Sequence, residues 1–363
     1  MSRHLAIFLP SLGAGGAEKV ILSLAERFVA RGIRCDLVIA IDSGRWLDRV
    51  PAGVCLVRLH KQKALSAVFA LARYLRRERP DALLSTIFSA NIAALIAAAL
   101  SRVGRIVIRE ANHVEIDVRA ETKAQTWMNR IAAGWLYPRA DVVIAVAESV
   151  REGLLRIHLV PESRIRVIRN PVSLVSLSKG TQPHVRDGST VLACGRLEPQ
   201  KDHATLLRAF AALRSRLGAK LVVLGEGSLL QTLQTQAINL GIHNDVAFVG
   251  FDPDPEQWMR SASVFAHTAL YEGFSNVLLE ALAAGCPVVA VDDSTGGVRE
   301  VLADGKYGTL VPVGDDRAVA SAIEQVLTKK VQFPDVREYL HQFDVDRVAD
   351  AYLSALFPTG HER

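Results

Sequence analysis

The sequence predicts an α/β protein made of two doubly wound, Rossmann-like domains, each built on a parallel sheet. Three observations lead to this prediction: the length, the alternation of short apolar runs with helix-length patterns, and one break in that alternation. The chain has 363 residues, which exceeds the usual size of one domain, and 50% of them are hydrophobic, enough for two cores. Disordered and fibrous classes are therefore excluded.

The first half of the chain alternates apolar runs with longer helical patterns, which is typical of stacked βαβ units. Its strand candidates are residues 5–9, 35–41, 82–85, 106–109 and 142–146. A glycine-rich turn leads into a helix expected from about Ala17 to Arg31. Residues 91–100 are strongly apolar but make up only about half of the ~20 residues that cross a bilayer, so they predict a buried helix and not a membrane anchor.

The pattern breaks near Asn170 and Pro171, and the polar residues 179–188 have the composition of a linker. The alternation then restarts, with strand candidates at 191–194, 220–224, 246–248, 264–267, 287–291 and 309–311. We expect an N-terminal domain at 1–172, a C-terminal domain at 173–345, and a last helix at about 346–363 that packs back on the first domain. Ligands of doubly wound sheets bind beyond the carboxyl ends of the strands, so we expect a ligand cleft where the two domains face each other.

Charge is distributed unevenly along the chain. The formal net charge is +5, but residues 1–170 hold 26 Lys and Arg against 15 Asp and Glu, whereas the remainder holds 17 against 23. The N-terminal domain is therefore predicted to prefer anionic partners. Arg73, Arg76, Arg77 and Arg79 crowd one helix end beside apolar side chains, which suits anionic lipid headgroups, although a solvated helix face explains any one of them.

Nucleic acid is the other large anion, and it is disfavoured. The sequence carries no recognition motif for it, no interleaving of aromatic and basic residues, and only 6% aromatics. The four cysteines show no C-x-x-C spacing, which excludes a zinc ribbon, a redox dithiol and a disulfide scaffold. We expect reduced thiols in a cytoplasmic protein, with neither a secretory signal nor a membrane span at the N-terminus.

A first candidate site is the turn at residues 10–18, Pro-Ser-Leu-Gly-Ala-Gly-Gly-Ala-Glu. Gly15 and Gly16 allow backbone N–H groups at a helix start to approach an anion, and the helix dipole adds attraction. The dinucleotide fingerprint requires a third glycine where Glu18 stands, so a nicotinamide dehydrogenase is disfavoured. A purely structural tight turn explains this motif equally well.

A second candidate site lies in residues 194–202, which leave a strand and enter a helix. Arg196 and Lys201 can converge on one anion from this loop, the first through a planar fork and the second as a point charge. A pyrophosphate is the natural ligand for such a pair. The alternative is that Lys201 pairs with Asp202 or Glu198 at the surface.

The most specific motif spans residues 271–290 and contains two carboxylates. Glu272 lies in a glycine-containing loop and Glu280 about one turn into a helix, so both can accept hydrogen bonds from ligand hydroxyls, while residues 273–276 present backbone N–H groups at the helix start. The alternative is a capped helix with Glu280 on its wet face. Apolar neighbours surround Glu280 in the sequence, and an unpaired carboxylate there is costly, which favours a ligand partner.

Taken together, these residues resemble the retaining glycosyltransferases of family 4 (glycosyl transferases group 1), which have the glycosyltransferase-B fold and use nucleotide-sugar donors. The likeness spans nearly the whole chain. The segments that carry it are Gly-Gly-Ala-Glu-Lys at 15–19, Ile-Arg-Asn-Pro-Val at 168–172, Gly-Arg-Leu at 195–197 with Lys201, Gly-Glu-Gly at 225–227, the Glu272/Glu280 motif, and Gly-Gly at 296–297 followed by Glu300.

The resemblance implies how the donor is bound. The N-terminal domain would bind the acceptor, and its Gly15 and Gly16 would face the donor diphosphate. The C-terminal domain would bind the nucleotide sugar, with Arg196 and Lys201 neutralising the diphosphate and Glu280 holding the ribose hydroxyls.

The resemblance also implies how the transferred sugar and the base are held. Glu272 and His113 would contact the sugar and count, with Arg196 and Lys201, as the catalytic residues. The segment that positions the sugar through its backbone would comprise Gly273, Phe274, Ser275 and Asn276. The loop with Gly250 and Phe251 would lie near the base.

Departure of the nucleoside diphosphate places negative charge on its phosphates. Arg196, Lys201 and the glycine-loop amides would stabilise this charge without a metal, so no metal or other cofactor is expected and the nucleotide sugar is a substrate. The resemblance implies departure and attack on the same face of the sugar, with the donor phosphate as base.

The acceptor is expected on the positively charged domain. A membrane-associated glycan or polyprenyl-diphosphate-linked acceptor combines negative charge with a membrane surface, so we expect a hexosyl- or N-acetylhexosaminyltransferase of surface polysaccharide or glycolipid synthesis, using a UDP-sugar and peripheral on the inner face of the cytoplasmic membrane. Two alternatives stay open: a nucleotide-sugar epimerase of the same fold, which needs no acceptor, and a non-catalytic binding subunit, against which the intact charged residues argue.

Overall fold

The computed structural model describes residues 3–101, 103–114, 123–158, 160–174 and 189–358. The chain divides into two compact units. Unit 1 comprises Met1–Pro171 and Val345–Arg363, and unit 2 comprises Val172–Asp344. The boundaries lie within one residue of those expected from the sequence. The predicted linker, residues 179–188, lies outside the described residues.

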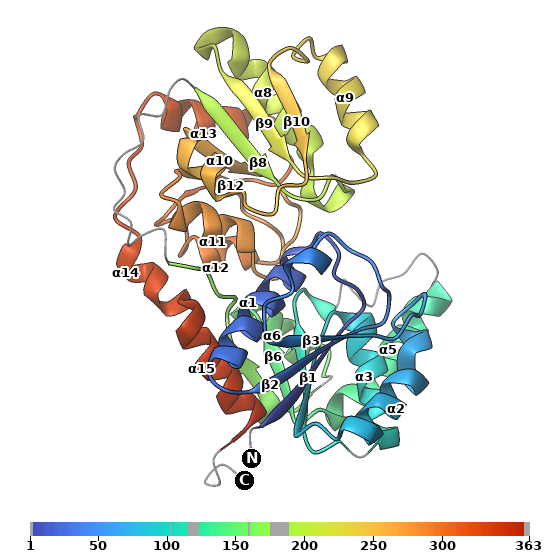
Figure 1. The fold of residues 1–363 in the computed structure, drawn as a ribbon. Coiled ribbons are helices and arrows are strands. Elements are labelled where there is room, and N and C mark those ends of the chain that lie inside the picture. Colours follow the sequence, from blue (N-terminus) through green and yellow to red (C-terminus); the bar gives the residue numbers. More distant parts are fainter. Residues whose placement is uncertain (1–2, 102, 115–122, 159, 175–188, 359–363) are drawn as a thin grey trace. The chain divides into compact units, whose positions relative to one another are not determined.

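Unit 1 is built on a seven-stranded parallel sheet with the order β3-β2-β1-β4-β5-β6-β7 (Figure 1). Its strands are β1 His4–Leu9, β2 Arg34–Ile39, β3 Val54–Arg58, β4 Ala82–Thr86, β5 Ile106–Glu110, β6 Val142–Ala145 and β7 Ile165–Val167. The two strands missed by the sequence analysis lie at the edges. β3 is half-exposed and its apolar run covers only residues 54–57, and β7 has only three residues.

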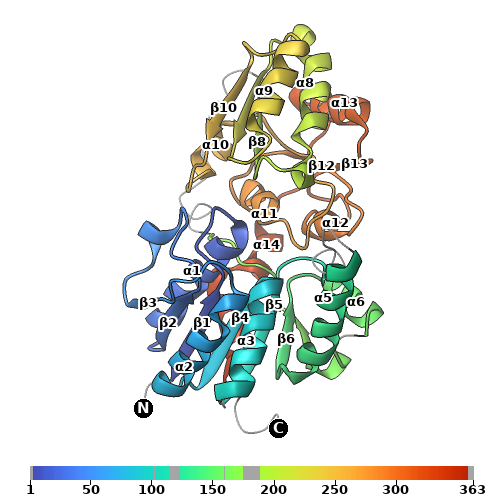
Figure 2. The same ribbon diagram turned by 90° about the vertical axis from the view of Figure 1, so that its right-hand side faces the viewer.

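Helices cover both faces of this sheet. They are α1 Gly16–Ala30, α2 Val68–Glu78, α3 Phe88–Ser101, α5 Lys123–Leu136, α6 Glu148–Arg156 and α15 Val345–Leu356. The helices α1 and α15 pack together over one face, and α2, α3 and α5 lie side by side over the other (Figure 2). Most of α3 is buried, as expected for the apolar segment at 91–100.

The C-terminal helix α15 belongs to unit 1 and is fixed there by polar and apolar contacts. The Arg31 guanidinium, at the end of α1, lies 3.1 Å from Asp346 Oδ1 and 2.8 Å from Asp350 Oδ1. Arg105 Nε donates to the Ala355 carbonyl at 2.9 Å, and the Tyr352 side chain has no solvent exposure. The helix is thus part of the core of unit 1, although 173 residues of unit 2 precede it in the chain.

Unit 2 contains a six-stranded parallel sheet with the order β10-β9-β8-β11-β12-β13. Its strands are β8 Thr190–Cys194, β9 Lys220–Leu224, β10 Val246–Gly250, β11 Val264–His267, β12 Val288–Val291 and β13 Thr309–Val311. Its helices are α8 His203–Leu217, α9 Leu230–Asn239, α10 Glu256–Ser261, α11 Asn276–Ala283, α12 Gly297–Val301, α13 Asp316–Leu327 and α14 Arg337–Leu340. Each of these strands matches a strand candidate of the sequence.

In both sheets the strand order reverses beside the first strand of the unit. In unit 1, β2 pairs with one side of β1 and β4 with the other; in unit 2, β9 and β11 flank β8 in the same way. Loops that leave such a pair of strands diverge and open a crevice, which is where doubly wound sheets bind ligands. In unit 2 these loops carry residues 195–202 and 268–275, the second and third candidate motifs.

The cysteines and the longest apolar helices were also subjects of prediction. None of the four cysteines, all within described ranges, forms a disulfide. Over the part of the chain that the structure describes, no helix combines the length and the apolarity needed to span a bilayer.

We predict that Tyr352→Ala lowers the free energy of unfolding of unit 1 by about 3 to 5 kcal/mol, because it leaves a cavity where a fully buried ring packs. Ser354→Ala on the exposed side of the same helix is the control and should change stability by less than about 0.5 kcal/mol. Urea unfolding followed by circular dichroism measures both. Equal stabilities of the two variants would show that α15 contributes nothing to the core of unit 1.

Candidate active site

An ion pair joins the two loops at the strand-order reversal of unit 2. Lys201 Nζ donates to Glu272 Oε1, and the two side chains are only 13% and 12% exposed. Lys201 ends the short helical turn after β8, and Glu272 lies between β11 and α11. The structure therefore brings together one predicted phosphate-binding cation and one predicted sugar-binding carboxylate.

The two surface partners considered for Lys201 have other roles, so that alternative is wrong. The Asp202 side chain caps α8 by accepting from Thr205 N at 3.2 Å. Glu198 accepts from Ser228 N at 2.9 Å and from Ser228 Oγ at 2.8 Å. Lys201 instead pairs across 71 residues, because parallel strands align their carboxyl ends.

The ion pair fixes the protonation state of Glu272. Burial by itself would raise the pKa of this carboxyl, but Lys201 and the neighbouring His267 outweigh burial and lower it to about 2. His267 Nε2 lies 3.4 Å from Glu272 Oε1, and burial lowers the pKa of the imidazole. At neutral pH the site therefore holds an ionised Glu272 carboxylate beside Lys201 and a neutral His267 imidazole.

Asp293, just after β12, holds the Glu272 loop in place. Its Oδ2 accepts from Glu272 N at 2.7 Å, and its Oδ1 accepts from Gly296 N at 3.0 Å and from Val298 N at 3.3 Å. A Cβ atom on Gly297 would lie 2.3 Å from the Glu272 carbonyl oxygen. The Gly-Gly motif at 296–297 thus lets this turn approach the backbone of the Glu272 loop, and Asp293 joins the two.

Gln200 connects the Arg196 loop to the Glu272 loop. Arg196 is exposed, and its Nη2 donates to Gln200 Oε1 at 2.9 Å. Gln200 Nε2 in turn donates to the Tyr271 carbonyl at 2.9 Å, and Leu270 N donates to the Gln200 carbonyl at 2.8 Å. Gln200 therefore holds the Arg196 guanidinium beside the loop that carries Glu272, and the guanidinium stays exposed to solvent.

The Gly-Glu-Gly motif at 225–227 packs closely against the backbone of the Arg196 loop. Gly225 adopts φ +140°, its N–H donates to the Gly250 carbonyl at 2.7 Å, and a Cβ atom on it would lie 1.9 Å from the Gly195 carbonyl oxygen. A Cβ atom on Gly227 would lie 2.4 Å from the Leu197 carbonyl oxygen. These glycines are required by close packing of three loops. Gly250 ends β10, and Phe251 follows it half-buried.

The loop that carries Glu272 continues into the start of α11. Gly273, Phe274 and Ser275 are buried, and the Phe274 ring packs on Phe343 with centroids 5.7 Å apart. Ser275 precedes the helix, and its Oγ lies 3.4 Å from His267 Nε2, with no side-chain cap on α11. The N–H groups of the first helical turn, which begins at Asn276, have no intrahelical acceptor. Glu280 lies half-buried one turn further on.

The other predicted site residues, Gly15, Gly16 and His113, belong to unit 1. Gly15 precedes α1, and a Cβ atom on it would lie 2.4 Å from Glu18 Oε2. Glu18 is buried, so a carboxylate of the protein itself lies over this turn and reduces its attraction for anions. The diphosphate contact of Gly15 and Gly16 stays a prediction.

His113 is buried and follows a polar cluster at the end of β5. Arg109, fully buried, donates to Thr86 Oγ1 at 2.9 Å and to Asn170 Oδ1 at 2.6 Å. Its neighbour Glu110 accepts from Asn91 Nδ2 at 2.7 Å. These bonds fix the backbone from which the His113 loop departs, and the sugar contact of His113 stays a prediction.

Three residues that contact Glu272 or hold its loop could be missed from the sequence: His267, Asp293 and Gln200. A signal for the first two was present, because His267 ends β11 and Asp293 follows β12, and parallel neighbours bring such positions to one sheet edge. Gln200 carried no signal, since its bonds to the Arg196 side chain and to the Tyr271 carbonyl depend on how two loops meet. Among the residues that the structure describes, no group of three or more His, Cys, Asp and Glu side chains is arranged to hold a metal ion.

We predict that His203, at the start of α8, makes unit 2 less stable as the pH falls. Burial, aided by Lys201, lowers its pKa from 6.5 to about 4, so below pH 6.5 the unfolded chain binds a proton that the folded unit excludes. The loss reaches about 3 kcal/mol near pH 4. Thermal unfolding of the wild type and His203→Gln at about pH 7 and about pH 4.5 tests this: the midpoint should fall less in the variant. An equal fall would contradict the prediction.

Two family models match the chain, one on each unit. The Glycosyltransferase Family 4 model matches residues 14–175, and the glycosyl transferases group 1 model matches residues 178–343.

Two curated bacterial relatives match over most of their length. The chain is 28% identical, over 90% of each chain, to the N-acetylgalactosamine-N,N'-diacetylbacillosaminyl-diphospho-undecaprenol 4-alpha-N-acetylgalactosaminyltransferase of Campylobacter jejuni. It is 26% identical, over 94% of this chain and 96% of the other, to the lipopolysaccharide core biosynthesis glycosyltransferase LpsE of Rhizobium meliloti.

Among solved structures, Anabaena HepE in complex with UDP and glucose matches with a TM-score of 0.81 at 20% identity, covering 98% of this chain and 99% of that one. The predicted fold of two Rossmann-like parallel-sheet units is confirmed by this match and by the two sheets. The chain therefore belongs to the group 1, family 4 glycosyltransferases and has the glycosyltransferase-B fold.

Proposed function

We propose that this glycosyltransferase moves a hexosyl or N-acetylhexosaminyl group, with retention of its anomeric configuration, from a UDP-sugar to a membrane-associated glycan. The acceptor proposed is a polyprenyl-diphosphate-linked glycan or a glycolipid of surface polysaccharide synthesis. The observation that carries the proposal is the nearly buried Lys201–Glu272 pair at the strand-order reversal of unit 2.

The reaction needs positive charge where the leaving group forms. The bond between the anomeric carbon and the β-phosphate oxygen breaks, and the electron pair stays on the diphosphate. Lys201 and the exposed Arg196 belong to the same loop, between β8 and α8, and supply two cations. The first N–H groups of α11 supply oriented dipoles. The acceptor hydroxyl then bonds to the anomeric carbon on the face the diphosphate left, and its proton passes to the departing phosphate oxygen.

The low pKa of Glu272 decides its role. A carboxyl with a pKa of about 2 is ionised near pH 7 and has no proton to give the leaving group. It serves instead as an acceptor for sugar hydroxyls and as the ion-pair partner of Lys201. We therefore assign leaving-group stabilisation to the cations and not to an acid, and we propose that the reaction proceeds without a metal.

The comparisons support the substrates proposed. The Campylobacter jejuni relative acts on a diphospho-undecaprenol glycan, and the Rhizobium meliloti relative acts in lipopolysaccharide core biosynthesis. The solved complexes of Anabaena HepE contain UDP, glucose or UDP-glucose. A UDP-sugar and a lipid-linked acceptor are therefore the first substrates to test.

The direct test is incubation of the full chain with UDP- and GDP-sugars, with and without lipid-linked acceptors. We expect UDP release that requires the acceptor, and a glycosidic product whose anomeric configuration, read by nuclear magnetic resonance, equals that of the donor. Consumption of the donor alone would identify an epimerase. Donor binding without turnover on any acceptor would identify a binding subunit, and an inverted product would refute the retaining mechanism.

We predict that Lys201→Met lowers kcat by about 100- to 1000-fold, since it removes a cation that acts on developing charge. The loss is measured as acceptor-dependent UDP release. K201M leaves Glu272 buried without its partner, so the double variant K201M/E272Q tests whether inactivity follows from misfolding: it should be stable and equally inactive.

Lys220→Met is the matched control for K201M. Lys220 is an exposed lysine of β9 that pairs with Asp245 at 3.3 Å, so the same exchange there should leave kcat unchanged. A wild-type rate for K201M would remove Lys201 from the mechanism.

A further inference from the structure

Unit 1 exposes large apolar side chains on one helical layer. Within the described ranges, those of unit 1 that are most exposed all belong to the layer of α2, α3 and α5 with the short turn Leu65–Ala67 that precedes α2. They are Leu65, Phe69, Leu100, Met128, Ile131 and Trp135. Clustered exposure of this kind marks an interaction surface and not a monomer's ordinary surface.

The spacing of these residues places them on continuous stripes. Met128, Ile131 and Trp135 stand three and four residues apart on α5 and are 57%, 41% and 70% exposed. Leu65 and Phe69 stand four residues apart, and Phe69 is 78% exposed. Residues at such intervals share one side of a helix. In Figure 2 the helices α2, α3 and α5 lie next to one another, so the stripes belong to one layer.

The same layer is strongly basic. Residues 60–79 and 123–139 together hold nine Lys and Arg and a single acidic residue, Glu78. Glu78 is engaged by Arg34 and Arg77, both at 2.9 Å. Arg73 and Arg76 are exposed and continue the Phe69 stripe along α2.

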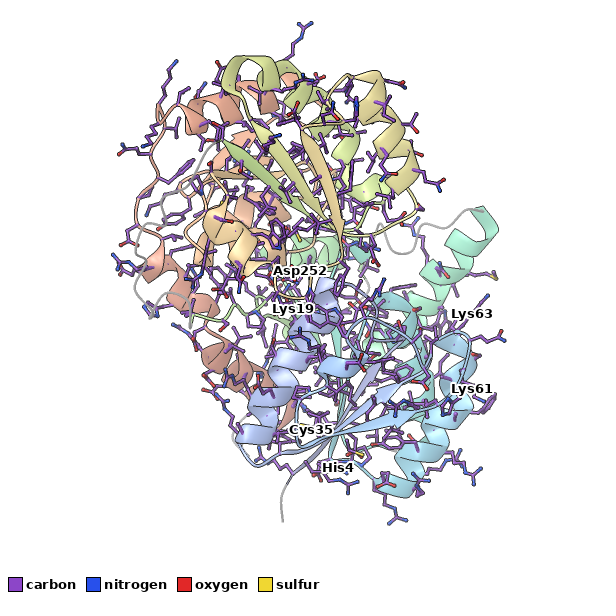
Figure 3. The ribbon with its side chains drawn as sticks, turned by 45° about the horizontal axis from the view of Figure 1, so that its top comes forward. His4, Lys19, Cys35, Lys61, Lys63 and Asp252 are labelled. Atoms are coloured by element: carbon purple, nitrogen blue, oxygen red, sulfur yellow. The ribbon has the colours of Figure 1, made fainter. Side chains whose placement is uncertain are left out.

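Lys61 and Lys63, labelled in Figure 3, are exposed beside α2. We call this layer, with its apolar stripes and its cations, the basic apolar face.

The opposite layer of unit 1 differs in both respects. The helices Gly16–Ala30 and Val345–Leu356 hold three basic and four acidic residues, and they expose no large apolar side chain in the part of the chain described. The excess of positive charge and the exposed apolar groups therefore coincide on one side of the sheet. Chance exposure of single residues would not produce this coincidence.

We propose that the basic apolar face docks on an anionic lipid bilayer, with Phe69 and Trp135 in the interfacial region and the surrounding Lys and Arg at the lipid phosphates. Aromatic rings flanked by cations are the composition that binds such a surface. A second copy of the chain is a poor occupant, because a two-fold contact would place the exposed cations Lys61, Lys63, Arg73 and Arg76 against the same set. This inference rests on the proposed function only for the purpose of docking, which is to give the enzyme access to a membrane-linked acceptor.

Vesicle sedimentation tests the proposal without any sugar chemistry. The full chain is mixed with vesicles of phosphatidylcholine, or of phosphatidylcholine with about one third phosphatidylglycerol, at low and high salt. We expect binding to the anionic vesicles that salt weakens. R73Q/R76Q should lose about 30-fold in partition coefficient, as expected for two surface cations. F69S/W135S should lose at least as much, and W135F should reduce quenching of tryptophan fluorescence by brominated acyl chains.

Matched controls come from unit 2. Ile238→Ser removes an apolar side chain that is 60% exposed on α9, and Arg317→Gln removes an exposed cation of α13; neither should change binding. Equal losses in the controls, or wild-type binding by both face variants, would overturn the proposal. A concentration-dependent dimer that W135S abolishes would also overturn it, because a second copy of the chain would then cover the basic apolar face. Acceptor-dependent UDP release by a chain that binds no vesicles would overturn this proposal and leave the proposed function standing.

Discussion

The ion pair between Lys201 and Glu272 is the interaction around which unit 2 arranges its functional groups. Burying two charges costs several kcal/mol of desolvation each, and apolar residues of similar volume would often stabilise the fold as well or better. The pair is therefore poorly explained by stability alone. A ligand that brings its own negative charge and hydroxyl groups can use both members, and the loops around them are held by Asp293 and Gln200 through bonds to backbone.

The topology of the parallel sheet explains why these groups meet. Lys201 and Glu272 are 71 residues apart, but β8 and β11 are neighbours in the sheet and both strands end at the same edge. The glycines at 225, 227 and 297 then let the loops beyond that edge approach more closely than any side chain would allow. The site thus depends on backbone packing as much as on its charged side chains.

The sequence was sufficient for the elements whose apolar pattern is continuous. All six strands of unit 2 were predicted. In unit 1 the apolar run at 54–57 was a signal for β3 that could have been used, whereas β7 is too short, at three residues, to leave a pattern. For the site, motif residues such as Arg196, Lys201 and Glu272 could be predicted one by one. The Lys201–Glu272 pairing, and the roles of His267, Asp293 and Gln200, depend on distances between loops that spacing along the chain does not encode.

In the proposed mechanism, Lys201 binds the diphosphate of the donor. Calorimetric titration of uridine, UMP and UDP into the wild type and K201M measures this most directly, because the three ligands differ only in their phosphates. We expect K201M to lose about 10- to 100-fold in UDP affinity, the range of one charge-assisted hydrogen bond, and to bind uridine as the wild type does. UDP affinity unchanged by K201M would show that Lys201 does not bind the diphosphate.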